Sequence, residues 1–537
     1  MKRRWISILC LAGMCMTAIP VMAEENANSS EIVIFVHTND VHAESLMSQW
    51  VYIDEVEVQQ QNGHGGHDGG DAEAETSVVQ VHPCYALLGV TYCSNPVDAE
   101  VQSMDIYVPA EYMGAVDNGD GTYTCTVNTE AVFERDGVSY TADTVPIIYQ
   151  NTIDGYRQGD SFNLGDQRKG GPGTFGSYLD SGYVAVSIGA RGQDSEVDGT
   201  APAAIIDLKA GVRYLKANDA VLPGDSNKIC ATGVSAGGSM TAVLAASGNS
   251  SLYDSYLEEI GAADATDDIY AALVFCPIAN LEMGDAAFEY LHFGELSASI
   301  GWGDNAELVE FDEFHLALHE QLINAYAEYL NGIGIDEEAF HTQFLDAINT
   351  AIAYYTDNYV DDKDAFAEEN PELSREGDTF SVADIDTFVS TYMARKKNIP
   401  AIDSLDKSST EAGLFDGEHF SECVYNILTE LSDTYEEAAS YAEEYAAELT
   451  QDRQEEVKLM SALTFLAGGE DSTVAPYWRF RNGTTDGDIG SIAAFTMKEL
   501  LDQKGVSTDY NLIWGMGHCA ADYEYEDVQN YVDSICK

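Results

Sequence analysis

A glycine-rich turn between a strand-like and a helix-like segment places the strongest constraint on the fold of this chain. The run NKICATGV is typical of a buried strand, and SAGGSMTAVLAAS, which follows it, is typical of a helix. The two meet at Gly233-Val234-Ser235-Ala236-Gly237-Gly238. Small residues around a serine in such a turn allow close packing against sheet and helix, and they leave the hydroxyl exposed at the helix N-terminus. The turn therefore predicts Ser235 as a nucleophile, the alternative being a helix cap rich in Gly and Ser.

Strands and helices alternate on both sides of this turn. The segment APAAIIDLKAGVRYLKAND has apolar residues at helical spacing, and YAALVFCPI is a short apolar run typical of a buried strand. The same alternation returns near the C-terminus in VAPYWRFRNG, SIAAFTMKELLDQKG and DYNLIWGMG. It predicts an α/β fold in which helices cover both faces of a mostly parallel central sheet.

A helical and very acidic segment interrupts this pattern between about residues 283 and 455. In FHLALHEQLINAYAEYL, for example, Leu318, Leu322 and Tyr326 fall on one helical face, which is typical of packing rather than of ligand contacts. We expect residues 77–282 and 456–537 to form the two parts of one α/β domain. Residues 283–455 are expected to form a helical lid over its active site.

The N-terminus has the features of a secretory leader. A Lys2-Arg3-Arg4 cluster precedes an apolar run that ends in Val21-Met22-Ala23, where a signal peptidase could cut. We expect residues 1–23 to be removed after Ala23 and the mature protein to be secreted or otherwise outside the cytoplasm. The alternative is an N-terminal membrane anchor, for which the apolar run is short.

Residues 24–76 predict a linker segment of low complexity. Its tract QNGHGGHDGGDAEAE is rich in glycine, so His64 and His67 are not expected to form a preorganised metal site. Upstream, VHTNDVH is similar to the opening strand of metallophosphoesterases of the nucleotidase kind, in which an Asp-x-His pair such as Asp40 and His42 binds metal. The further Asp, Asn-His and Gly-His motifs of that family are not found downstream, which argues against this alternative.

Charge and cysteine content restrict the partners and the compartment. The formal net charge is −67, and so anionic a surface repels nucleic acid and anionic lipid while it favours solubility. Adaptation to salt is a second explanation. Two of the ten cysteines, Cys10 and Cys15, lie in the leader, and the even remainder is consistent with disulfides. Cys84 and Cys93 are close enough in sequence to pair, whereas Cys276 lies in an apolar run and is expected to be buried.

Residues that could complete a catalytic triad follow the later strands. In α/β-hydrolases an acid and then a histidine follow the nucleophile, each in a loop after a strand. His518 lies in a turn after the last predicted strand, and Asp486 and Asp488 lie in the loop after the preceding strand. Either aspartate could orient His518 and stabilise its imidazolium. The N–H groups of Ala236 and of the turn around Asp154 are expected to form the oxyanion hole.

The chain from about residue 77 onward contains motifs that are specific when taken together. They are YCSNPVDAEVQSMDIYVP, GARG, APAAIIDLKAGVRYLKANDAVLPGD, GVSAGGSM, ASGNSSLYDSYLEEIGAADATDDIYAALVFCPIANLE, APYWRFRNGTTDGD and WGMGHCAADYE. These segments resemble bacterial tannases, which are tannin acyl hydrolases related to feruloyl esterases within the α/β-hydrolases. The resemblance implies hydrolysis of galloyl esters under a lid, with Ser235, Asp486 and His518 as the triad.

The resemblance also implies a binding site for the substrate ring. In that family a Lys and a Glu of the lid, with an Asp two residues after the catalytic Asp, bind the hydroxyls of the galloyl ring. The segment ARKKNIPAIDSLDKSSTEAGLFDG matches that lid region, so Lys397, Glu411 and Asp488 are carried over, with Lys396 as the alternative to Lys397. Two departures stand out. The fungal branch joins cysteines beside the Ser and the His, whereas this chain has Val234 before its serine, and DKSST replaces an expected apolar stretch.

Together these assignments predict a secreted serine esterase that acts through an acyl-enzyme. Its chemistry requires no metal or organic cofactor, and its expected partner is a small galloyl ester or polyphenol. The nearest alternative is a feruloyl or general carboxylic-ester hydrolase, and a second is a non-catalytic polyphenol-binding protein on the same fold. A serine peptidase is less favoured because no propeller-like repeat precedes the turn. The sequence predicts no oligomeric state.

Overall fold

The computed structural model describes residues 7–8, 19–20, 49–60, 75–167, 173–300, 306–469, 471–519 and 522–537. The predicted cleavage site and most of the leader lie outside this part of the chain, within which β1 (Ser7–Ile8) pairs with β2 (Ile19–Pro20). Asp40, His42, His64 and His67 also lie outside it. Among the helices of the described residues, none combines the length and the apolarity needed to cross a bilayer.

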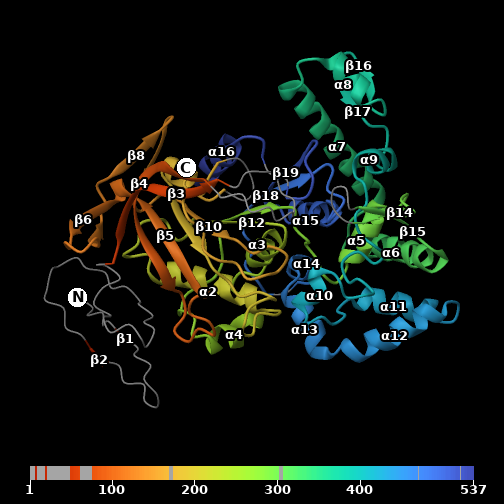
Figure 1. The fold of residues 1–537 in the computed structure, drawn as a ribbon, viewed down its shortest axis with the longest axis horizontal. Coiled ribbons are helices and arrows are strands. Elements are labelled where there is room, and N and C mark those ends of the chain that lie inside the picture. The colour runs from red at the N-terminus through yellow and green to blue at the C-terminus, as the bar shows by residue number, and fades with distance from the viewer. Residues whose placement is uncertain are drawn as a thin grey trace.

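A nine-stranded sheet occupies the centre of the molecule, with the strand order β19-β18-β13-β12-β10-β11-β5-β4-β3 (Figure 1). The strands from β19 to β11 are parallel, and β5, β4 and β3 extend that edge in antiparallel fashion. The bounds are β3 (Val51–Gln60), β4 (Glu75–Thr91), β5 (Ser103–Pro109), β10 (Ile147–Asn151), β11 (Val184–Ile188), β12 (Ile229–Val234), β13 (Ala271–Phe275), β18 (Tyr477–Gly483) and β19 (Ser507–Ile513). The predicted α/β class with a mostly parallel sheet is confirmed.

Helices cover both faces of this sheet. Every residue of β10, β11, β12 and β13 is buried, which explains why these strands are apolar without alternation. α2 packs on α3, while the rings of Tyr178 in α1 and Tyr525 in α16 contact each other. α2 and α16 lie on opposite sides of the sheet in Figure 1. The bounds are α1 (Ser177–Asp180), α2 (Ala203–Ala217), α3 (Ala236–Ala246), α4 (Asp254–Glu259), α15 (Ile492–Gln503) and α16 (Tyr525–Cys536).

Residues 51–60, which the sequence analysis assigns to a linker, instead form β3 at the edge of the sheet. Val51, Ile53 and Val58 pack against the core while acidic residues between them face solvent. The sequence analysis missed this strand because its many acidic residues are typical of a linker, although an edge strand needs only one apolar face. The antiparallel hairpins β6 (Met113–Asp117) with β7 (Tyr123–Val127) and β8 (Val132–Arg135) with β9 (Val138–Thr141) also lie in this half of the chain. The tract 62–70 lies outside the described residues.

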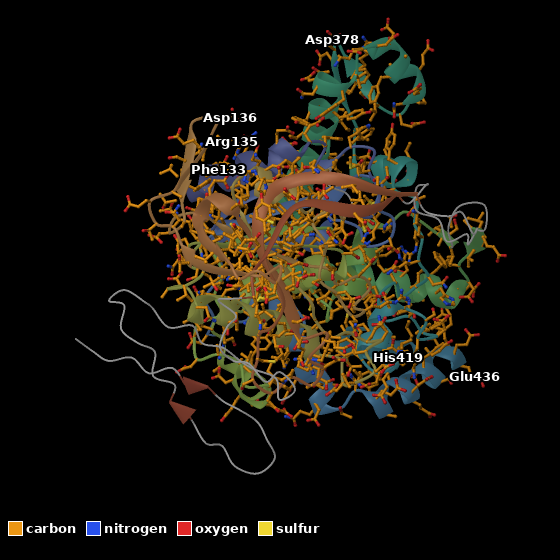
Figure 2. All side chains as sticks on the ribbon, turned by 60° about the vertical axis from the view of Figure 1, so that its left-hand side comes forward. Phe133, Arg135, Asp136, Asp378, His419 and Glu436 are labelled. Carbon is orange, nitrogen blue, oxygen red and sulfur yellow. The ribbon has the colours of Figure 1, made fainter. Side chains whose placement is uncertain are left out.

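A large insertion separates β13 from β18, which are direct neighbours in the sheet. Besides helices it contains two short hairpins, and Figure 2 shows Asp378, in the turn of the second hairpin, at the far tip of this region. The predicted bounds, 283–455, fall within the insertion. Its helices are α5 (Gly284–Leu291), α6 (Glu313–Gly332), α7 (Glu337–Tyr359), α8 (Lys363–Glu369), α9 (Ile385–Tyr392), α10 (Thr410–Leu414), α11 (Glu422–Leu431), α12 (Glu436–Glu448), α13 (Gln451–Leu459) and α14 (Ala462–Ala467). Its strands are β14 (Ser297–Ile300), β15 (Glu307–Glu310), β16 (Ser374–Glu376) and β17 (Thr379–Ser381).

Side-chain caps mark where several helices of the insertion begin. Each capping oxygen accepts a hydrogen bond from a backbone N–H of the first turn, where the helix itself supplies no acceptor. The capping residues are Asp312, Asp336, Asp362, Asp384, Ser409, Ser421 and Thr450. Part of the acidic content of the insertion is therefore explained by local helix formation, since carboxylates also interact favourably with the positive end of a helix dipole.

No disulfide joins the cysteines of the described residues. The expected pairing of Cys84 with Cys93 is not formed, because Cys84 lies in the extended strand β4, where nine residues span roughly 30 Å. The sulfur atoms of Cys230 in β12 and Cys536 in α16 lie 4.0 Å apart. Cys276 is buried as expected.

Candidate active site

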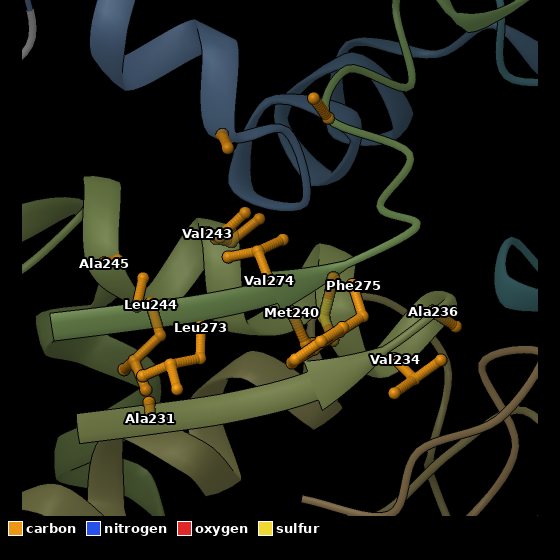
Figure 3. Close-up of a cluster of buried hydrophobic side chains, with 14 of the residues drawn as sticks. Ala231, Val234, Ala236, Met240, Val243, Leu244, Ala245, Leu273, Val274 and Phe275 are labelled. Carbon is orange, nitrogen blue, oxygen red and sulfur yellow. The ribbon is translucent and has the colours of Figure 1, made fainter. Parts of the chain in front are cut away.

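Ser235 lies at the junction of β12 and α3, in a strained turn. Its φ is +58°, in the left-handed region that side chains rarely adopt. A Cβ atom on Gly233 would lie 2.3 Å from the carbonyl oxygen of Gly237, so only glycine permits this approach of strand and helix. The N–H of Ser235 donates to the carbonyl of Phe275 at the end of β13, at 2.9 Å. Figure 3 shows Val234, Met240 and Phe275 among the buried side chains that pack around this turn.

The residues predicted as a triad form one hydrogen-bonded chain. Ser235 Oγ lies 2.8 Å from His518 Nε2, and His518 Nδ1 lies 3.0 Å from Asp486 Oδ2. Asp486 follows β18 and His518 follows β19, and both strands run parallel to β12. The carboxyl ends of parallel strands lie at the same edge of a sheet, which explains how residues so distant in sequence meet here. Of the two candidate aspartates, Asp486 carries the hydrogen bond to His518.

The surroundings keep Asp486 ionised and favour protonation of His518. Burial raises the pKa of Asp486, but the His518 charge and the N–H groups of Asp488 and Ile489 lower it below its usual value. Burial lowers the pKa of His518, and the Asp486 carboxylate more than offsets this, so that the net shift is upward. The pair is therefore suited to stabilise the imidazolium that forms when His518 removes a proton from Ser235.

The expected oxyanion donors lie on two neighbouring segments. Ala236 is the first residue of α3, where an N–H group has no acceptor within the helix. The loop after β10 is anchored beside it, because the N–H of Gly237 donates to the carbonyl of Ile153 at 3.1 Å. Asp154 follows directly, with its side chain exposed. The role of its N–H as an oxyanion donor stays a prediction.

The three residues predicted to bind the substrate ring form a cluster beside the triad. Lys397 Nζ lies 4.0 Å from Glu411 Oε2 and 3.8 Å from Asp488 Oδ1. Asp488 Oδ2 lies 3.9 Å from His518 Nε2, so the cluster adjoins the nucleophile. Glu411 is only 2% exposed, and its Oε2 has no hydrogen-bond partner among the described residues. Burial lowers the pKa of Lys397, but the nearby carboxylates, Glu411 first, raise it above its usual value and keep the ammonium charged.

Comparisons with known proteins show what this chain resembles. A family model described as BD-FAE, a feruloyl esterase domain, matches residues 156–290. The crystal structure of the tannase from Fusobacterium nucleatum is 29% identical, with a TM-score of 0.70, over 90% of this chain and 98% of that chain. The tannin acyl hydrolase from Lactobacillus plantarum is 26% identical, with a TM-score of 0.69 and the same coverage. A search of curated proteins found no match.

The chain is therefore an α/β-hydrolase that is similar to tannases over 90% of its length and to the feruloyl esterase family model over residues 156–290. It is therefore a carboxylic ester hydrolase, as the sequence predicts. One similar structure is a tannin acyl hydrolase in complex with ethyl gallate. A further tannin acyl hydrolase structure holds 3,4-dihydroxybenzoate.

A buried ion pair of the insertion holds the backbone that carries Lys397 in this esterase. Arg395 and Glu289 are both fully buried, and both nitrogens of the guanidinium fork donate to the carboxylate. Arg395 also donates to the carbonyls of Lys397 and Asn398, each at 2.8 Å. The sequence analysis missed this pair because its members are 106 residues apart and leave no local pattern. The only feature of the sequence that could have pointed to this ion pair is the run of three basic residues at 395–397.

The insertion contacts the loops that carry the predicted site residues. A Cβ atom on Gly487 would lie 1.8 Å from the carbonyl oxygen of Ala394, so glycine is required for this approach. The N–H of Lys396, the alternative to Lys397, donates to the carbonyl of Gly487 at 3.0 Å. Gln193 Nε2 donates at 3.1 Å to the carbonyl of Thr410, next to Glu411 in α10. The insertion thus borders the site, where a lid would lie.

A separate cavity of about 590 Å³ lies between α6, α11 and α13 of the insertion. Its lining includes Glu328, Tyr329, Glu422 and Lys458, and none of the predicted site residues. The nucleophile, its base and its acid do not face this cavity, so its size is not a guide to the chemistry of the esterase.

Proposed function

We propose that this esterase hydrolyses galloyl esters of tannins and alkyl gallates, with Ser235 as nucleophile, His518 as general base and Asp486 as its orienting acid. Lys397, Glu411 and Asp488 would bind the ring hydroxyls of the substrate. The observation that carries the proposal is the position of this second cluster, which adjoins His518 through a 3.9 Å contact. The ethyl gallate and 3,4-dihydroxybenzoate bound in two similar tannin acyl hydrolase structures also support the proposed substrate class.

The cluster suits a ring that carries adjacent hydroxyl groups. Glu411 Oε2 is buried without a hydrogen-bond partner among the described residues, and such an acceptor is costly unless a ligand supplies a donor. Phenol hydroxyls supply donors in a row, and the single positive charge of Lys397 offsets part of the negative charge of the two carboxylates. A substrate without these hydroxyls would leave charged groups unpaired, which is a strong source of selectivity.

The proposed reaction proceeds through an acyl-enzyme. His518 removes the proton of the Ser235 hydroxyl, and Oγ attacks the ester carbonyl. The N–H groups of Ala236 and Asp154 stabilise the resulting oxyanion. The His518 imidazolium protonates the departing alcohol or phenol, and a water molecule activated by the same imidazole then releases gallate from Ser235.

Replacing Glu411 by glutamine tests the role of the cluster. We expect Glu411→Gln to lower kcat/KM for methyl gallate by roughly 10- to 100-fold, because a hydrogen bond to a charged group contributes about 1.5–3 kcal/mol. For methyl benzoate, which has no ring hydroxyl, the change should stay within about threefold. Glu437→Gln, on an exposed position of α12, is the matched control and should change neither value. Equal losses on the two esters would refute the assignment of Glu411.

Hydrolysis of feruloyl esters is the second candidate, favoured by the BD-FAE match over residues 156–290. The ratio of kcat/KM for methyl gallate to that for methyl ferulate separates the two. We expect the ratio to exceed one, because a ferulate ring has a single free hydroxyl beside a methoxy group, which cannot both donate to the Glu411 and Asp488 carboxylates and accept from the Lys397 ammonium. A ratio below one would support the feruloyl esterase assignment.

We propose in addition that the protein is exported and that its leader is cut after Ala23. The basic cluster and the apolar run of residues 1–23 support this. Mass spectrometry of the protein recovered from the culture medium should find an N-terminus at Glu24. Recovery of the intact N-terminus in the cell fraction alone would contradict it.

A further inference from the structure

A thiol that the proposed mechanism does not use lies beside the His518–Asp486 pair. Cys276 directly follows β13, and its side chain is fully buried. One metal-ligating atom from each of Cys276, Asp486 and His518 lies within 4.8 Å of the other two. No other group of three His, Cys, Asp or Glu side chains in the described part of the chain meets this criterion.

The spacing of these atoms is close to that of ligands around one metal ion. Zn²⁺ holds sulfur at about 2.3 Å and nitrogen or oxygen at about 2.0–2.2 Å, so ligand atoms that share it lie roughly 3.5 Å apart. Movements of about 1 Å or less in each side chain are therefore sufficient to close the present spacing. Rotation about the side-chain bonds of Cys276 and His518 supplies movements of this size.

The donor set selects the kind of cation. Sulfur, imidazole nitrogen and carboxylate oxygen are the ligands of Zn²⁺ and Cd²⁺, whereas Mg²⁺ and Ca²⁺ prefer oxygen alone. A Cys276 thiolate and the Asp486 carboxylate together balance the double positive charge, so the buried complex has no net charge. Binding releases the Cys276 thiol proton and the second proton of the His518 imidazolium to solvent, and it breaks the 3.8 Å contact of Cys276 Sγ with the Arg481 carbonyl. The net charge of −67 also raises the local concentration of cations.

We propose that Cys276, Asp486 and His518 form an inhibitory site for thiophilic divalent cations such as Zn²⁺ and Cd²⁺. A cation bound there occupies the imidazole and the carboxylate, so His518 no longer removes the proton of Ser235. The inhibition rests on the proposed function of His518, whereas the binding itself does not.

Cd²⁺ titration of the full chain tests binding and inhibition separately. Binding is followed by the ultraviolet charge-transfer absorption of the cadmium–thiolate bond, and inhibition by the rate of methyl gallate hydrolysis. We expect Cd²⁺ to inhibit the wild-type protein, EDTA to reverse the inhibition, and Mg²⁺ to have no effect at the same concentration. Cys276→Ser should raise the Cd²⁺ concentration for half-inhibition by about tenfold or more and remove part of the absorption. Ser235→Ala should keep the whole absorption, since the serine is not a ligand.

Cys423→Ser is the matched control, because that thiol lies in α11, outside the group of Cys276, Asp486 and His518. It should leave both readouts unchanged. Cys276→Ala is the second variant, and the thermal unfolding of both variants shows whether they keep the fold. Unchanged inhibition in a folded Cys276 variant, or its loss in Cys423→Ser instead, would overturn the proposal. Absence of esterase activity together with Cys276-dependent absorption would overturn the proposed function and leave the cation site standing.

Discussion

Two histidine–aspartate pairs in this esterase share the same bond and differ in their surroundings. His518 Nδ1 lies 3.0 Å from Asp486 in the sheet domain, and His419 Nδ1 lies 2.9 Å from Asp403 in the insertion. Both aspartates are fully buried. The second nitrogen of His518 meets the hydroxyl of Ser235, whereas that of His419 is buried with no hydrogen-bond partner among the described residues.

The insertion pair acts as a cross-link between segments. The ring of His419 stacks on Tyr445 with centroids 3.7 Å apart, and Asp403 also accepts hydrogen bonds from the N–H groups of Phe420 and Ser421. Figure 2 shows His419 in the same lower part of the insertion as Glu436, the first residue of α12. The comparison teaches that the bond between imidazole and carboxylate is not itself a sign of catalysis. What surrounds the other ring nitrogen decides the role.

The largest effect should follow from removing the acid of the first pair. We expect Asp486→Asn to lower kcat/KM for methyl gallate by about 10⁴-fold with the fold retained. The neutral imidazole is the active form, so activity rises with pH through the pKa of His518. Since the carboxylate raises that pKa, its loss should move the acidic limb of the pH–rate profile to lower pH. An unshifted pH–rate profile, or a loss of kcat/KM below about tenfold, would contradict the assignment of Asp486 to the triad.

A smaller effect, of a different kind, should follow from removing the acid of the second pair. Asp403→Ala leaves His419 and two backbone N–H groups without their acceptor, which should lower the free energy of unfolding by about 3 kcal/mol or more. The folded variant should keep kcat/KM within about tenfold of the wild type. Denaturant unfolding measures the free energy of unfolding, and methyl gallate kinetics measure kcat/KM. Loss of activity at unchanged stability would assign the second pair a part in the reaction.

A third effect, seen only in the pH dependence of stability, concerns Asp285, which supports the segment between Lys397 and Asp403. Its carboxylate accepts from the N–H groups of Ile402 and Asp403, and burial together with the Asp403 charge raises its pKa from 3.8 to about 8. The folded state thus binds this proton more tightly than the unfolded state, and stability falls as pH rises from about 4 to about 8. The side chain of the Asp285→Asn variant cannot ionise. The melting temperature of the variant, relative to that of the wild type, should therefore increase as pH rises over this range. A constant difference at all pH values would contradict the protonated state of Asp285.

Most of what governs the triad could be predicted from local sequence. The small residues around Ser235 require a sharp turn, and the order of strands predicts that the loops with Asp486 and His518 lie at the same edge of the sheet. The hydrogen bonds at 2.8 and 3.0 Å agree with that prediction. The edge strand β3 was missed, since an exposed strand with one apolar face looks like a charged linker.

The sequence by itself determined the alternation of strands and helices and the turn at Ser235, because these follow from local backbone geometry and apolar periodicity. The residues of the second cluster, Lys397, Glu411 and Asp488, were predicted from the resemblance to tannases instead. Only the tertiary structure decided which aspartate bonds to His518, that Arg395 and Glu289 support Lys397, and that Cys276 lies beside the triad. Such contacts depend on how distant segments pack against one another. That packing is a property of the whole chain, and no short stretch of sequence records it.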